Sequence, residues 1–434
     1  MGKQVINQKN GIDSFLVFVF ALGIMISPDS LAMLGIFFGE TGYIGFFLIL
    51  FSTVIYLALL SQYKQIFIFL SGNSSDIEIL KTTMGTISAF FSFFVKMIVA
   101  IFLSTGLLVS SGFVFNEVFL YWFPNFGFAF GLLGLLLGLQ FLPNKVGLYF
   151  QIGFCGIAIS GLLILIIAGI IQTDQLIHFK PAGIDFSINS NGLDTFFLPL
   201  LFFIGFDLSF TVWNKSEQKY PKKYHILFAA VIFMSLLFIL WGYVLLTYVP
   251  MEKLMNSRIP HMIAAKNILG DPGRFIMGTI IISGSLAAIH ALFTSILKQG
   301  SMLLKTNMLV KSIKRPQIII LTLALIIAGM MVGGMAGKEE LETLIRASLI
   351  LWLISYTMIS ITHILILGRA GKRHHINLLI KETINVMCVL ILGISILILI
   401  VMDDNSILIL KFLGVAFFIG LTPGILLMFR DNTT

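Results

Sequence analysis

The chain is a succession of long apolar runs separated by short polar stretches. Cutting it at charged or Pro-, Gly- and Asn-rich positions gives about twelve segments that are long enough to cross a bilayer. Such segments must be helical, because lipid offers no hydrogen-bond partner to backbone amides and carbonyls. The connection 250–273 is long enough to carry a further helix. The expected spans are residues 13–38, 42–61, 85–111, 127–142, 147–171, 194–213, 226–249, 273–297, 317–336, 342–367, 376–401 and 407–429.

Composition agrees with an all-α polytopic membrane protein. Of 434 residues, 58% are hydrophobic and only 11% charged, and the mean hydropathy is +1.01. A soluble chain of this length needs far more polar surface, so the apolar side chains must face the lipid bilayer. The net charge of +8 lies in short loops rather than on one face, so we expect no nucleic acid partner. The two cysteines, Cys155 and Cys388, lie within apolar runs and give no disulfide framework.

The distribution of lysine and arginine predicts the orientation. With the N-terminus inside, most basic residues fall in cytoplasmic loops, including the four lysines of the loop 214–223. We therefore expect both termini, residues 1–12 and 430–434, in the cytoplasm, and the chain in the plasma membrane. The first apolar run is too long for a signal peptide and is expected to be retained as a span.

Two spans carry an interruption near the middle. In the first, Ser27-Pro28-Asp29-Ser30 places a proline and an acid within an apolar run, and in the sixth Pro199, Gly205 and Asp207 repeat the pattern. Proline removes a backbone donor, and an acid at this depth is costly unless it faces a polar cavity. We expect helices one and six to be unwound near residues 26–30 and 203–207 and to lie side by side.

The two interrupted spans begin two stretches of about five spans each, which indicates a 5+5 inverted repeat. The first repeat would be residues 13–171, the second 194–367, and the helices within 376–429 would be peripheral. In transporters with such repeats, broken helices form a solute site near the bilayer midplane. This pattern predicts a secondary active transporter of a small polar solute.

A resemblance to a known family supports this interpretation. The stretch FFIGFDLSFTVWNKSEQKYPKK, residues 202–223, resembles the sixth helix and following loop of the amino acid/polyamine/organocation transporter superfamily, with its leucine-transporter-like fold. Residues Gly284 to Lys305 resemble the eighth helix of that family, with His290 where an Asn often stands. The motif positions in the first stretch are Phe203, Gly205, Phe206, Asp207, Glu217 and Pro221.

The resemblance implies a solute site at the two breaks. The expected solute-binding residues are Ile26, Ser27, Asp29, Ser30, Phe203, Gly205, Phe206 and Asp207. The first break departs from the family, whose glycine-rich amides bind a substrate carboxylate, because Pro28 lacks an amide hydrogen and Asp29 repels a carboxylate. The sequence therefore favours a solute with a cationic amine, or a carboxylate accompanied by a metal cation. At least one of Asp29 and Asp207 should contact that cation.

The coupling ion stays open between H⁺ and Na⁺. Proton-coupled relatives often hold a lysine in the fifth helix, but residues 147–171 contain none. Lys96 lies about 15 Å into the third span, where it either faces the bundle and pairs with an acid or reaches the headgroups along the lipid face. A sodium site would combine carbonyls of the first break with hydroxyls of helix eight. The coupling candidates are Lys96, Ser283, Ser285 and His290.

Two other classes of function compete with a transporter. One is a non-transporting membrane subunit or sensor of the same fold, and the other is a membrane-embedded enzyme. The chain has no phosphate-binding loop and no His-rich metal spacing, so we expect neither an enzyme nor a cofactor. A metal site is left undecided. The remaining acids lie in predicted loops, where they are expected to be solvated.

Overall fold

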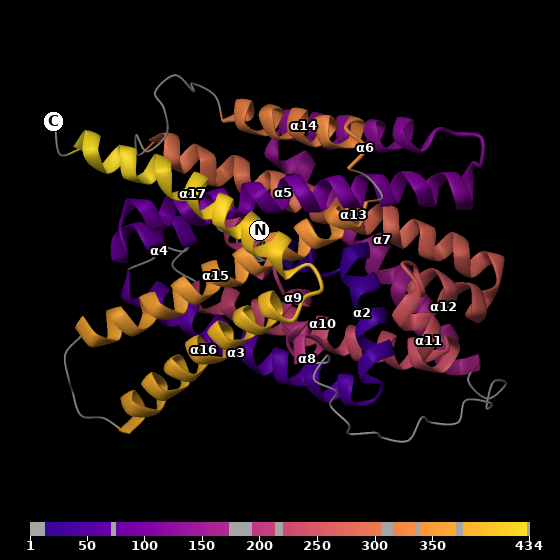
Figure 1. The fold of residues 1–434 in the computed structure, drawn as a ribbon, viewed down its shortest axis with the longest axis horizontal. Coiled ribbons are helices and arrows are strands. Elements are labelled where there is room, and N and C mark those ends of the chain that lie inside the picture. Colours follow the sequence, from indigo (N-terminus) through magenta and orange to yellow (C-terminus); the bar gives the residue numbers. More distant parts are fainter. Residues whose placement is uncertain are drawn as a thin grey trace, which may run out of the picture.

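The computed structural model describes residues 14–70, 75–172, 193–212, 220–305, 316–335, 338–369 and 376–431. The described part is helical throughout, with no strand (Figure 1). Residues 14–22 are helical and lead into the first interruption. The predicted cytoplasmic segment 1–12 and much of the loop 214–223 lie outside the described residues.

The helices follow the apolar runs of the sequence. Eight of them are long and apolar enough to cross a membrane. These eight, three shorter apolar helices and the interrupted segment 14–41 correspond to the predicted spans. The elements are α2 (Pro28–Thr41), α3 (Ile44–Phe69), α4 (Asp76–Thr83), α5 (Thr86–Val114), the π-helix η1 (Phe115–Phe119), α6 (Asn125–Phe141), α7 (Asn144–Ile171), α8 (Leu193–Phe197), α9 (Pro199–Phe202), the 3-10 helix η4 (Phe206–Val212), α10 (Tyr220–Tyr248), α11 (Met251–Asn256), α12 (Pro260–Leu269), α13 (Asp271–Lys305), α14 (Gln317–Val332), α15 (Glu339–Arg369), α16 (Ile376–Val401) and α17 (Ser406–Asp431).

The prediction of an all-α polytopic membrane protein is confirmed, and several boundaries are corrected. The second span extends eight residues beyond the predicted end at residue 61, to Phe69. The connection 250–273 contains two short helices, α11 and α12, rather than one. The predicted loop before the third span contains α4, which hydropathy alone could not distinguish from a surface segment. The limits of the two repeats and of the peripheral helices remain predictions.

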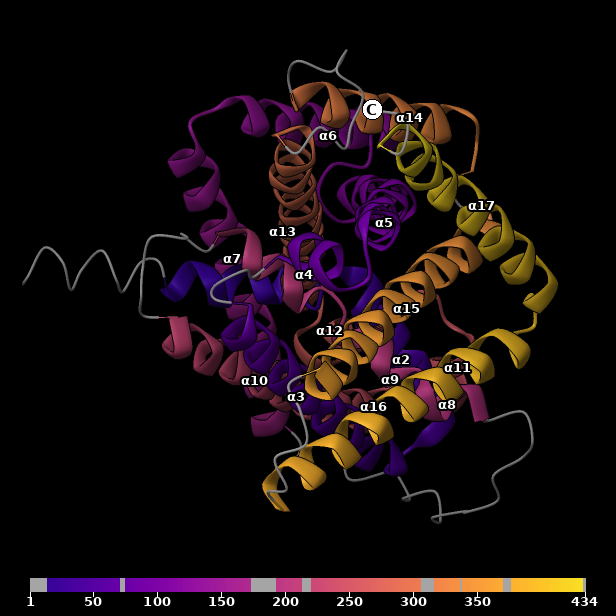
Figure 2. The same ribbon diagram turned by 90° about the vertical axis from the view of Figure 1, so that its left-hand side faces the viewer.

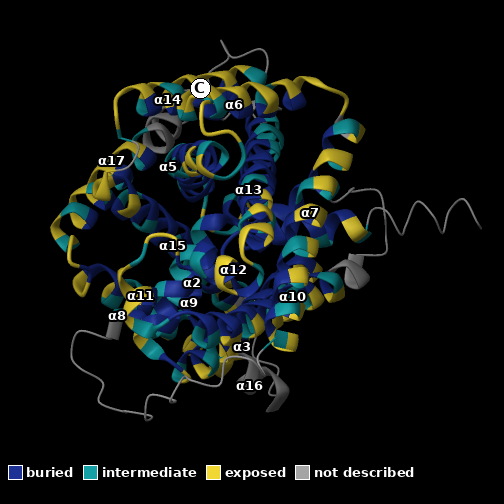
Figure 3. Ribbon diagram, turned by 90° about the vertical axis from the view of Figure 1, so that its right-hand side faces the viewer, coloured by how far each residue is buried: buried dark blue, intermediate teal, exposed yellow. Residues whose placement is uncertain are grey.

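The centre of the bundle is formed by α5. This helix packs against α13, α15, α17, α4, α6 and α14, and in Figure 2 it is seen end-on with these helices around it. Buried residues concentrate toward the middle of the molecule and exposed ones toward its rim (Figure 3). The exposed residues include many Ile, Leu, Val and Phe side chains, which is expected of helices that face lipid.

Candidate functional site at the two helix breaks

The first helix is interrupted at residues 23–27, where turns replace regular helix. Helix α2 begins directly afterwards, with Ser27 as its N-cap and Pro28 in its first turn, a position where the missing amide hydrogen costs nothing. The Ser27 hydroxyl accepts a hydrogen bond from the Ser30 amide at 3.3 Å. The unwound stretch therefore lies a few residues earlier than predicted. Asp29 and Ser30 belong to helix α2, because Pro28 starts a helix here rather than breaking one.

The second interruption separates α9 from η4 at residues 203–205. Gly205 has φ +104°, a conformation that side chains rarely adopt, so glycine is required at this turn. Its amide donates to the hydroxyl of Tyr356 at 3.1 Å, and that hydroxyl in turn donates to Asp207 Oδ1 at 2.6 Å. On the other side of the break, the Tyr56 hydroxyl donates to the carbonyl of Leu200 at 2.6 Å. Two tyrosines thus replace the hydrogen bonds that a continuous helix would make.

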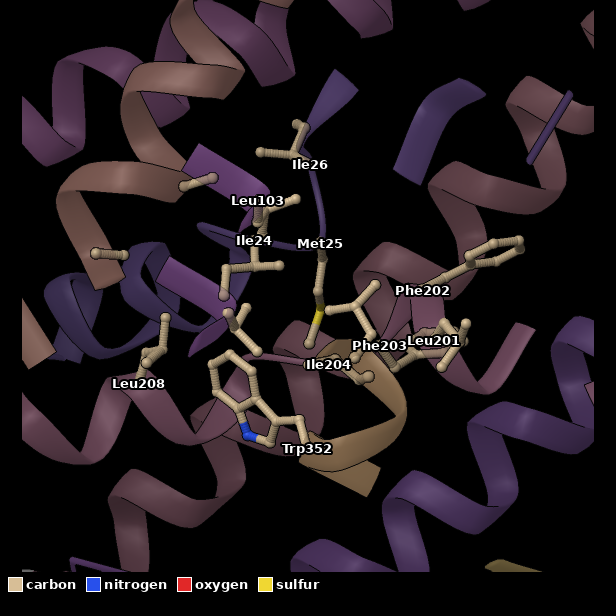
Figure 4. Packing of buried hydrophobic residues seen from close by; sticks show 14 of the residues in the cluster. Ile24, Met25, Ile26, Leu103, Leu201, Phe202, Phe203, Ile204, Leu208 and Trp352 are labelled. Atoms are coloured by element: carbon tan, nitrogen blue, oxygen red, sulfur yellow. The ribbon is translucent and has the colours of Figure 1, made fainter. Parts of the chain in front are cut away.

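The two breaks touch each other. A Cβ at Gly205 would lie 2.9 Å from the Cβ of Ile24, so the backbone at Gly205 packs directly against the Ile24 side chain and leaves no room for a side chain of its own. Figure 4 shows Ile24, Met25 and Ile26 of the first break beside Phe203 and Ile204 of the second. Most side chains around this contact are apolar and buried. The site therefore offers polarity through its backbone and through the charged groups at its two ends.

Three charged side chains meet next to the second break. Lys96 Nζ lies 2.8 Å from Asp207 Oδ2 and 2.8 Å from Asp76 Oδ2, and all three side chains are at most 2% exposed. The ammonium group also lies 5.9 Å from the centre of the Trp352 ring. Lys96 therefore faces the interior of the bundle rather than lipid. We call Lys96, Asp76 and Asp207 the charge cluster.

Helix α4 carries Asp76 and places it beside Lys96. The chain turns at Gly85, with φ +95°, so α4 runs back along the first turns of α5. Ser75 caps α4 by accepting from the Glu78 amide at 3.2 Å. Ile77, Ile79 and Leu80 are buried. The expectation that the loop acids are solvated is therefore wrong for Asp76, because the helix that carries it re-enters the bundle.

Asp29 lies apart from the charge cluster, one residue into helix α2. It is partly exposed, and it makes no hydrogen bond or ion pair with any residue that the structure describes. Its nearest charged neighbours in electrostatic terms are Glu342 and Arg346 of α15. Arg346 is held by Asp403 at 3.0 Å, with the Asp403 side chain 6% exposed. Among the described residues, Asp29 is thus an unpaired acid next to the first break, with charged groups of α15 as its electrostatic neighbours.

The predicted solute-binding residues lie around the two breaks but face different surroundings. Ile26, Ser27, Phe203, Gly205 and Phe206 are buried where the breaks meet. The Ser27 and Ser30 hydroxyls bond to each other at 3.1 Å. Asp207 faces Lys96 and Tyr356, so its charge is already partnered. Of the two predicted acids, Asp29 alone lacks a partner among the described residues.

The four coupling candidates fall in separate places. Ser285 Oγ lies 2.9 Å from Ser111 Oγ on α5. Ser283 donates to the carbonyl of Thr279 and lines a largely apolar cavity of about 340 Å³. Lys96 lies in the charge cluster, far along the sequence from both serines. Gly284, between the two serines, packs against the first break: a Cβ there would lie 2.7 Å from the carbonyl oxygen of Ile26. A sodium site formed by these groups stays a prediction.

His290 marks a junction of helices one, five and eight. Its Nδ1 lies 2.8 Å from Gln151 Oε1, and Gln151 Nε2 donates to the carbonyl of Ala287 at 3.1 Å. Nearby, the Cys155 thiol donates to the carbonyl of Val19 at 3.4 Å. Neutral donors therefore satisfy the carbonyls of Ala287 and Val19 at this junction.

Sequence reasoning missed three members of these networks. Asp76 had a local signal, since Ser75 and Glu78 form an N-cap pattern ahead of buried isoleucines. Tyr356 and Gln151 had none, because a single polar residue in an apolar span does not reveal its partner on another helix. Their roles follow from tertiary contacts alone.

Comparison with known proteins places this geometry in a structural class. No protein-family model matches the chain, and no curated protein matches its sequence. Among solved structures, the chain is similar to the manganese transporter of Eremococcus coleocola in complex with an aromatic bis-isothiourea compound, with a TM-score of 0.56, 12% identity and 95% of each chain covered. A single-residue variant of that transporter gives a TM-score of 0.59 and 12% identity over 95% of this chain and 94% of that one. The chain therefore has the fold of a membrane transporter over nearly its whole length.

Proposed function

We propose that the protein is a secondary active transporter that moves a small polar solute by alternating access. The solute would be an amino acid, amine or related organocation, and the protein would belong to the amino acid/polyamine/organocation superfamily. The observation that carries this proposal is the contact between two interrupted helices, Gly205 against Ile24. Paired breaks of this kind expose backbone dipoles to a solute near the midplane of the membrane.

Asp29 is the group we assign to the cationic part of the solute. Asp207 is held by Lys96 and Tyr356, whereas Asp29 has no partner among the described residues. A carboxylate at low dielectric attracts a cation more strongly than it does in water. Ser27 and Ser30 lie within one turn of Asp29, and their mutual hydrogen bond is exchangeable for bonds to a polar solute.

A metal cation is the second candidate because the similar solved structures are of a manganese transporter. In the part of the chain that the structure describes, no three His, Cys, Asp or Glu side chains come together as a metal site. The organic cation therefore stands first, and Mn²⁺ serves as a separate arm of the test. Orientation with both termini in the cytoplasm, and location in the plasma membrane, belong to the same proposal.

Uptake into proteoliposomes tests the proposal. Purified protein is first screened for thermal stabilisation by amino acids, polyamines, other amines and Mn²⁺. A ligand at a concentration of 100 times its Kd raises the free energy of unfolding by about 2.7 kcal/mol. Each hit is then offered as a labelled solute. We expect uptake of an amine-bearing solute, loss of that uptake in Asp29→Asn, and unchanged uptake in the control Asp404→Asn, which alters an exposed acid.

Three results would count against the proposal. Uptake unaltered by Asp29→Asn would remove Asp29 from the site. If Mn²⁺ were taken up and no amine were, the solute would be a metal cation and not an organic one. Binding without uptake of any solute would support a non-transporting sensor of the same fold.

A further inference from the structure

The charge cluster has a net charge that the proposed solute site does not explain. Its two carboxylates and one ammonium sum to one negative charge when all three groups are ionised. All three are buried, and an uncompensated charge in such surroundings costs several kcal/mol. One further positive charge would make the cluster neutral.

The hydrogen bonds show where that charge can be held. Asp207 Oδ1 accepts from Tyr356, and the Oδ2 atoms of both acids lie 2.8 Å from Lys96 Nζ. Asp76 Oδ1 is buried and has no hydrogen-bond partner among the described residues. A metal cation such as Ca²⁺ or Mg²⁺ requires about six oxygen ligands, whereas a proton requires only one.

We propose that the charge cluster binds one proton, on Asp76, and that this proton is the coupling ion of the transport cycle. The coupling role rests on the proposed function, whereas proton binding by the cluster does not. In the neutral state, protonated Asp76 and the Lys96–Asp207 ion pair hold α4 against the second break. When the proton leaves, two carboxylates compete for a single ammonium.

Loss of the proton favours entry of water along α4. The negative charge that remains is better solvated in water than in the apolar interior, so the deprotonated cluster favours a state in which α4 separates from η4. Asp207 is joined through Tyr356 to the Gly205 amide, so this separation acts directly on the second break. Binding and release of the proton therefore alter the second break, which forms one wall of the proposed solute site.

The tyrosines near the cluster do not account for this proton. They come from α3, α10 and α15, and their hydroxyls titrate near pH 10 in water. The Tyr63 hydroxyl lies near Asp76 and interacts with it electrostatically. The side chains that interact electrostatically with Asp76 or Asp207 include Lys96, Tyr56, Tyr63, Tyr224 and Tyr356.

Infrared difference spectroscopy as a function of pH tests proton binding without any solute. In the full-length protein in lipid, we expect a carboxyl group of the charge cluster to lose its C=O signal as the pH rises. This signal should disappear in Asp76→Asn and persist in Asp403→Asn, which alters a buried acid on the other side of the bundle. In Lys96→Met the midpoint should rise by about one to three pH units, because removing a nearby cation favours the protonated acid.

The outcomes are decisive in both directions. A titration that is identical in wild type and Asp76→Asn would overturn the proposal, as would a midpoint that Lys96→Met does not move. If Asp76→Asn fails to fold, Tyr356→Phe serves instead. It removes the donor to ionised Asp207 and should also raise the midpoint, and an unchanged midpoint would contradict the proposal. If the midpoint shifts are observed but no solute is taken up, the proposed transport function is refuted, whereas proton binding by the charge cluster stands.

Discussion

Replacing Lys96 with methionine tests the energetics of the charge cluster. Methionine keeps much of the side-chain volume but leaves Asp207 without its ammonium partner at 2.8 Å, in a site that is at most 2% exposed. Removing one partner of a buried ion pair destabilises proteins by about 3–5 kcal/mol, because the remaining charge is uncompensated. We expect a loss of that size in the free energy of unfolding.

The assay is reversible unfolding in mixed micelles at a series of pH values. The loss in Lys96→Met should shrink as the pH falls, because the unpaired carboxylates then take up protons and become neutral. The double variant Lys96→Met/Asp207→Asn should recover part of the stability, since it removes the orphaned charge. The control Arg258→Met breaks an exposed pair with Glu339 and should cost at most about 1 kcal/mol. A loss in Lys96→Met no larger than in this control, or no recovery in the double variant, would refute the reasoning.

Two further predictions follow from the fold. Gly205→Ala should cost about 1–3 kcal/mol from its positive φ and about 1–3 kcal/mol from contact with Ile24, whereas Gly153→Ala, which meets nothing within 4 Å, should be neutral or stabilising in the same unfolding assay. Equal effects of the two substitutions would argue against a close contact at the breaks. A cysteine placed in the loop 214–223 should react with an impermeant thiol reagent only from the cytoplasmic side, and labelling from outside would invert the orientation.

Much of the fold was predictable because membrane spans leave a strong signal in hydropathy. Lipid requires about 20 apolar residues per crossing, and this requirement locates the spans. Their ends were less predictable, since the second span extends eight residues beyond its predicted end. The breaks were also visible, since proline, glycine and an acid are unusual together at the middle of a span. The position of the first break was shifted by a few residues, because Pro28 is compatible with the first turn of a helix as well as with an interruption.

The site was less predictable because its contacts join distant parts of the chain. Lys96 was recognisable as a charge at unusual depth, but the sequence left its direction open. Asp76 looked like a loop acid, and only the turn at Gly85 brings it back to the depth of Lys96. Tyr356 bridges the second break from α15, more than a hundred residues away, and no local pattern indicates that contact.

In the proposed transport cycle, the two breaks form a site that opens alternately to either side of the membrane. Met25 lies in the first break and is fully buried in this state. In a background that lacks Cys155 and Cys388, Met25→Cys is treated with impermeant thiol reagents in vesicles of each orientation. Leu107→Cys, on the interior face of α5, serves as the control and should stay unreactive. We expect Met25→Cys to react from both sides and to be protected by the transported solute. Reaction from only one side, or from neither, would contradict it.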